Sequence, residues 1–168
     1  MKKMTMFALL AVTVPWAQAH ITLEQKQAPA GSYYKAVVQV PHGCAGSATT
    51  AIRVQIPEGV MGAKPQPKPG WKLTIQKAKL AQTTSNAHGH AQTDRVVEIA
   101  WTGGSLKDEE FDEFRIVMRL PDVPGKLYFP VIQECKAGEA RWVGVPAADQ
   151  MPGEMDFPAP VLELQAPR

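Results

Sequence analysis

The chain has 168 residues, with 18 Lys and Arg, 16 Asp and Glu, and a formal net charge of +2 at pH 7. This balance excludes a strongly basic protein. Because a nucleic-acid-binding surface needs clustered positive charge, we expect no nucleic-acid partner. A chain of this length suits one domain with one hydrophobic core.

The first residues have the three parts of a secretory signal peptide. Lys2 and Lys3 give a positive start, an apolar stretch runs from Met6 to about Trp16, and the small-any-small triplet Ala-Gln-Ala follows at 17–19. The apolar stretch is shorter than the roughly 20 residues that a membrane-spanning helix needs. An uncleaved membrane anchor and a buried N-terminal strand are the alternatives.

Cleavage after this triplet would give a signal peptide at 1–19 and a single domain at 20–168 that begins with His20. The signal contains two lysines and no acidic residue, so the domain would carry 16 basic and 16 acidic residues. No later stretch is apolar enough to span a bilayer. We therefore expect a secreted protein in the periplasm or the extracellular medium.

Short runs with apolar residues at alternate positions follow one another along the domain, as expected for strands with one buried face. The runs lie at 35–40, 52–56, 72–76, 97–101, 114–120, 127–133, 141–145 and 161–164. No segment shows sustained helical periodicity, and 15 prolines and 13 glycines suit the turns. About eight or nine short strands predict an all-β fold, an immunoglobulin-like antiparallel β-sandwich.

Three segments are expected to be loops. Residues 61–70 are too rich in proline for a central strand. Residues 81–94 are polar and contain His88 and His90. Residues 146–160 are rich in proline, and we expect them to pack loosely along the surface.

Cys44 and Cys135 are the two cysteines of the chain, and their separation of 91 positions resembles no compact metal or redox motif. An even pair in an oxidising compartment favours a disulfide bond. Such a bond would close a long loop and stabilise the fold by on the order of 4 kcal/mol. A pair of thiolate metal ligands is the alternative.

His20 would carry both a free α-amine and an imidazole after cleavage, and the amine and Nδ1 of one terminal histidine can chelate one metal ion. A free α-amine has a pKa of about 7.7 to 8.0, and it must lose its proton to bind. Two nitrogens in a plane, completed by oxygen, suit Cu(II). The alternative is that His20 is only the first residue of a frayed end.

A series of short motifs runs through the domain. They are AHITL at 19–23, GS at 31–32, VPHGC at 40–44, IPEGV at 56–60, KPGW at 68–71, FDEF at 111–114, QEC at 133–135 and GEARW at 138–142. Each motif alone is unspecific, but their order and number resemble the YcnI-like copper-binding family of exported bacterial proteins. The resemblance implies an immunoglobulin-type sandwich that holds Cu(II) through one N-terminal histidine, a carboxylate and a nearby tryptophan.

The resemblance implies that His20 chelates the metal and that Trp142 is the family tryptophan, which could cover the site with its ring. Glu113 is the first candidate for the carboxylate because it lies in the FDEF motif. Glu24 is the second: four residues of extended strand put it about 13 Å from His20, so direct ligation would need a bend. Glu134 is the third. Each glutamate could instead be a solvated strand residue, and Trp142 could be a core residue.

The remaining histidines have two readings each. His42 could be a second metal ligand or a turn residue bonded to backbone, and we favour the turn. His88 and His90 could capture an ion weakly, but ordinary exposure is favoured. The seven methionines form no cluster that would indicate a Cu(I) site.

The leading functional hypothesis is a copper carrier or chaperone in copper acquisition or homeostasis, with a copper ion and a membrane copper transporter or another periplasmic copper chaperone as partners. The chain has no nucleophile elbow, phosphate loop or HExxH motif, so we expect no enzyme. An oxidative copper enzyme is one alternative and would need a second histidine. A metal-free secreted interaction module is the other.

Overall fold

The computed structural model describes residues 20–85, 91–147 and 155–166. Every regular element in these ranges is a β-strand, so the predicted all-β class is confirmed. No helix within the same ranges is long and apolar enough to cross a membrane. The predicted signal peptide, His88 and His90 lie outside the described residues.

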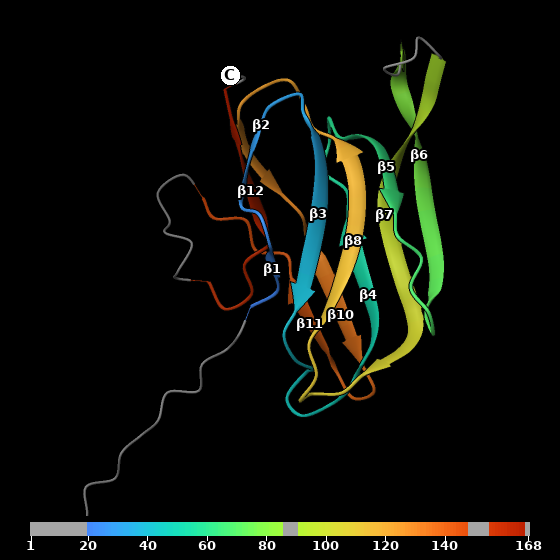
Figure 1. The fold of residues 1–168 in the computed structure, drawn as a ribbon, viewed down its shortest axis with the longest axis vertical. Coiled ribbons are helices and arrows are strands. Elements are labelled where there is room, and N and C mark those ends of the chain that lie inside the picture. Colours follow the sequence, from blue (N-terminus) through green and yellow to red (C-terminus); the bar gives the residue numbers. More distant parts are fainter. Residues whose placement is uncertain (1–19, 86–90, 148–154, 167–168) are drawn as a thin grey trace, which may run out of the picture.

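In the described part of the chain, twelve strands form three sheets, whose arrangement can be followed in Figure 1. The four-stranded sheet has the order β1 (Thr22–Leu23), β3 (Tyr33–Val40), β8 (Asp112–Arg119) and β5 (Met61–Pro65). The five-stranded sheet has the order β11 (Glu139–Trp142), β10 (Val131–Cys135), β4 (Thr49–Gln55), β7 (Ala91–Leu106) and β6 (Lys72–Ser85). The three-stranded sheet has the order β2 (Gln27–Pro29), β12 (Val161–Gln165) and β9 (Gly125–Tyr128). All pairs are antiparallel except β2 with β12.

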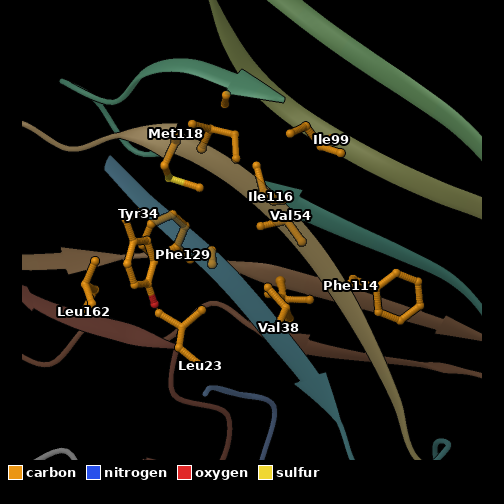
Figure 2. Packing of buried hydrophobic residues seen from close by; sticks show 14 of the residues in the cluster. Leu23, Tyr34, Val38, Val54, Ile99, Phe114, Ile116, Met118, Phe129 and Leu162 are labelled. Atoms are coloured by element: carbon orange, nitrogen blue, oxygen red, sulfur yellow. The ribbon is translucent and has the colours of Figure 1, made fainter. Parts of the chain in front are cut away.

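The core lies between the two larger sheets and is closed on one side by β12. Val38 and Phe114 from the four-stranded sheet, Val54 and Ile99 from the five-stranded sheet, and Leu162 from β12 are all buried (Figure 2). The alternating pattern of each strand supplies this face, since every second side chain points inward. The fold is therefore the sandwich that the sequence predicted.

The proline-rich segment 61–70 is not a loop throughout, as had been expected. Residues 61–65 form β5, which pairs with β8 at the edge of its sheet. An edge strand tolerates proline because one of its sides makes no ladder hydrogen bonds, and Pro65 is the last residue of this strand. Gly62, with φ of +62°, lies where the register shifts and bends the strand.

The expected loop at 81–94 is shorter than predicted. β6 continues to Ser85 and β7 begins at Ala91, so the two strands form a long hairpin that rises above its neighbours in Figure 1. The polar sequence suits this hairpin because most of its distal side chains are exposed. Residues 86–90, within the predicted loop, lie outside the described residues.

The run at 127–133, expected to be one strand, is two strands in two sheets. β9 ends at Tyr128 and β10 begins at Val131. Phe129, between them, is fully buried, so the apolar alternation continues across the junction and hides the change of sheet. The predicted disulfide is confirmed: Cys44 and Cys135 are bonded, with Cα atoms 6.0 Å apart, and tie the loop after β3 to the end of β10.

Candidate metal centre

His20 lies on the side of the sandwich where the edges of two sheets come together. It lies two residues before β1, the edge strand of the four-stranded sheet, and it faces Trp142 on β11, the edge strand of the five-stranded sheet. The two ring centroids are 5.6 Å apart at an interplanar angle of 74°. The structure therefore brings together two of the residues that the sequence had assigned to one site.

Trp142 is 1% exposed and is held on several sides. Its Nε1–H donates to Oε1 of Gln133 over 3.1 Å, and its ring packs edge-on with Phe157, with centroids 5.1 Å apart. The indole N–H is thus already bonded. Trp142 can offer its ring to a ligand beside His20 but no nitrogen.

Gln133 connects Trp142 to the loop after β3, and the sequence had not identified this role. The residue is 1% exposed. Its Nε2 donates to the backbone oxygen of His42 over 2.7 Å and to Oγ1 of Thr49 over 2.8 Å. The amide therefore uses both its oxygen and its nitrogen on buried partners. A glutamine at an inward position of an alternating strand was the signal in the sequence.

The C-terminal segment packs against the same side of the molecule. Gly144 donates to the Phe157 oxygen over 3.0 Å and accepts from the Ala159 N–H over 2.8 Å. A side chain at Gly144 would meet Met155, so this glycine permits the close approach. Part of the expected loose loop at 146–160 is thus fixed, while 148–154 lies outside the described residues.

His20 borders an open pocket of about 370 Å³. Met155 and Tyr128 line it, together with two exposed lysines, Lys26 and Lys126. The described carboxylates are absent from the lining of this pocket. Any small anionic or neutral group that approaches His20 from this side would therefore meet positive rather than negative charge.

Glu113, the first candidate for the carboxylate, lies in a different environment. It is the register partner of Gln39, which is in turn the partner of Thr22. Two strand spacings thus separate Glu113 from β1, about 10 Å. Its carboxylate accepts from the Arg115 guanidinium over 2.7 Å, and it lines another pocket beside Lys68. The structure does not bring Glu113 to His20.

Glu24 is exposed one residue after β1, and its N–H donates to the Val37 oxygen over 3.0 Å. Burial, together with the negative charge of Glu24, raises the pKa of Tyr34 to about 12.

Glu134, the third candidate, accepts a hydrogen bond from Arg53, and this bond holds the pKa of Arg53 above its ordinary value.

Most of the chain matches one protein family. Residues 20–164 match the model described as "Domain of unknown function (DUF1775)". The chain belongs to the DUF1775 family. The match begins at His20 and includes all twelve strands except the last residue of β12.

Two relatives of this DUF1775 chain are informative. It is 28% identical over 145 residues to "Copper-binding protein CutI" of Bacillus subtilis, covering 84% of the chain and 63% of that protein. It also superposes, with a TM-score of 0.64 and 27% identity, on the crystal structure of an uncharacterized protein from Nocardia farcinica that has an immunoglobulin-like fold. That match covers 86% of this chain and 97% of the other, and it confirms the predicted fold class.

The described residues offer few donor atoms for a metal beside His20. Among the described residues, no group of three or more His, Cys, Asp or Glu side chains is arranged to hold a metal ion. The exposed His20 imidazole beside Trp142 is a donor at a surface position. These residues fit a metal that accepts a small set of nitrogen ligands, and they do not fit a closed cage of side chains.

Proposed function

We propose that the chain is exported, is cut after Ala19, and then binds Cu(II) through the α-amine and Nδ1 of His20. The contact between the His20 and Trp142 rings carries this proposal, because it seats the chelating residue against a buried indole. Membership of the DUF1775 family and similarity to a copper-binding protein support copper as the metal. The uncut precursor lacks the amine and should lack the site.

Trp142 acts in this proposal as a wall of the site. Its ring packs edge-to-face against the His20 imidazole, while its N–H remains bonded to Gln133. Bound Cu(II) would supply a Lewis-acidic centre that favours nitrogen ligands in a plane. The chain itself supplies the amine, the imidazole and the apolar cover.

The proposed role is that of a carrier or chaperone in copper acquisition or homeostasis. A chelate built on one exposed terminal residue can be approached from solvent, so a partner can replace its ligands one at a time. A membrane copper transporter or another periplasmic chaperone would be such a partner. Copper transfer to a chelator of known affinity, without reductant-driven oxygen consumption, is the behaviour expected of a carrier.

The test compares proteins that differ in whether His20 has a free α-amine. Residues 20–168 with His20 as the true first residue are titrated with Cu(II) beside the same protein that carries Ser-Gly-Ser-Gly before His20. A longer extension is used because a histidine in the second or third place forms another Cu(II) chelate with backbone amides. The matched control carries Ser-Gly-Ser-Gly after Arg168.

We expect the N-terminal extension to weaken Cu(II) binding at least tenfold, about 1.4 kcal/mol, and to change the spectrum of the complex. The C-terminal extension should leave both unchanged. Equal affinities and spectra for all three proteins would refute the proposed chelate. Cell fractionation with N-terminal sequencing tests export, which predicts His20 as the first residue of the exported protein.

A further inference from the structure

We infer that the open edge of β6 binds an extended, acidic segment of a partner protein, which pairs with it as an added strand. The inference goes beyond the proposed function and does not depend on copper binding. Three features of the described residues support it: an unpaired strand edge, a groove beside that edge with partly exposed apolar side chains, and lysines without an ion-pair partner.

The edge of β6 lies on the side of the sandwich away from His20. β1 and β11, the strands beside the His20 site, stand at one end of the two strand orders, and β5 and β6 stand at the other end. The three-stranded sheet closes the first side, since β12 contacts β1. In Figure 1 this sheet lies across the molecule from β5 and β6. A partner on β6 would therefore leave His20 accessible.

β6 is a strand of 14 residues, and within the described ranges it pairs with β7 alone. Natural proteins usually shorten, bend or cover such an edge, because its unpaired N–H and C=O groups can bind another chain. From Lys72 to Gln76 the register with β7 is unbroken, so this part of the edge is regular. Recognition by strand addition uses these backbone groups for affinity and alternate side chains for specificity.

A groove of about 370 Å³ lies between the β6–β7 hairpin and β5. Leu73, Ile75 and Val96 line it from the hairpin, and Ala63 lines it from β5. Ile75 is 42% exposed, although its register partner Ile99 is fully buried. A strand added to β6, with an apolar residue facing the groove, would extend the five-stranded sheet and bury Ile75.

The charges along this edge favour an acidic occupant. Lys72 and Lys77 on β6, and Lys64 on β5, form no ion pair with the described residues. The carboxylates of Asp94 and Glu98 on β7 are each held by another basic side chain. The edge therefore presents positive charge that the described chain does not balance. Carboxylates on an added strand would balance it.

The same lysines disfavour a second copy of the chain as the occupant. Pairing of β6 with β6 would bring the lysines of both copies close together, and like charges on facing strands destabilise a sheet. Edge lysines commonly protect a protein from such self-association. An acidic strand is attracted by the charges that repel another β6, so the edge selects between the two.

The test uses isotopically labelled residues 20–168 and the probe peptide acetyl-Glu-Val-Glu-Val-Glu-Val-Glu-amide, which alternates acidic and apolar side chains. The control peptide has lysine in place of each glutamate. Titration followed by the chemical shifts of the backbone amides measures affinity and maps the peptide on the strands. Sedimentation velocity shows whether the protein alone forms dimers.

Two variants divide the charge from the apolar contact. Lys72→Gln with Lys77→Gln removes two positive charges from the edge. Ile75→Thr removes apolar surface but keeps a β-branched side chain, which suits a strand. The matched control is Lys35→Gln with Lys136→Gln, because these lysines are also exposed and without an ion pair but lie on β3 and after β10.

We expect the acidic peptide to shift amides of β5 and β6, to bind less tightly as salt is added, and to bind each edge variant about fivefold more weakly. The control variant should keep its affinity, and the lysine peptide should not bind. Absence of binding, shifts confined to other strands, or equal affinities for all variants would overturn the inference. Dimers of the protein alone, mapped to this edge, would make a second copy the occupant and would also overturn it.

Discussion

Replacing Gln133 with leucine removes one amide that serves three buried groups. The Trp142 indole N–H and the His42 oxygen lose their partner, and Thr49 loses the donor to its hydroxyl. Each polar group left buried without a partner costs about 1–3 kcal/mol. The added apolar burial of leucine offsets only part of this. We expect Gln133→Leu to lower the free energy of unfolding by about 3 kcal/mol.

Urea unfolding measures this change. Typical domains have free energies of unfolding of about 5–15 kcal/mol, so the loss is a large fraction of the total. With a urea slope of about 1–3 kcal/mol per M, the midpoint should fall by about 1 M or more. Hydrogen exchange of the Trp142 indole N–H gives a local readout, and it should become faster in the variant.

Gln76→Leu is the matched control for this prediction. Gln76 lies on β6 with an exposed side chain, and its Nε2 donates to Glu98 over 3.0 Å at the surface. Water can replace that partner, so the control should change stability by less than about 0.5 kcal/mol. A loss of under about 1 kcal/mol for Gln133→Leu, or equal losses for both variants, would refute the reasoning that the buried amide fastens this side of the sandwich.

Three further predictions concern other parts of the molecule. Replacing Cys44 and Cys135 with serine should lower the free energy of unfolding by about 4–5 kcal/mol in urea, and a loss under about 1 kcal/mol would contradict the loop-closure argument. The pKa of Tyr34 is raised from 10.0 to about 12 in the folded state. The neutral Tyr34 hydroxyl therefore stabilises the fold fully below pH 10, and this stabilisation is lost as the pH rises towards 12. Tyrosinate absorbance should show this late ionisation, and Tyr34→Phe should remove it. Glu113→Gln should keep Cu(II) affinity within about twofold, while a tenfold loss would show that Glu113 reaches the ion.

The strands could be predicted where burial is one-sided and the strand is long. Residues 33–40 of β3 and 112–119 of β8 alternate because one face packs on the core and the other meets solvent. β1 and β2 have two and three residues, too few to show a period. β5 was missed because proline content cannot distinguish a loop from an edge strand.

His20 and the disulfide could be predicted from the sequence, whereas the hydrogen bonds of Gln133 could not. His20 could be found because cleavage would create a distinctive chelating residue. The disulfide could be found because the chain has one pair of cysteines and a leader that predicts an oxidising compartment. Gln133 and His42 could not be joined to Trp142, because side-chain hydrogen bonds across 91 and 9 positions have no sequence period. Only the packed sheets bring these residues together.

The family motifs divide between two regions of the structure, which bears on the choice of ligands. The KPGW and FDEF motifs meet at the Lys68–Asp112 ion pair and at the ring of Phe114, which Trp71 contacts over 5.1 Å. The VPHGC, QEC and GEARW motifs meet instead at the Gln133 network. Membership of a motif therefore does not assign a residue to the metal site. Glu113 was ranked first by its motif, whereas the strand register and its hydrogen bond with Arg115 place it away from His20.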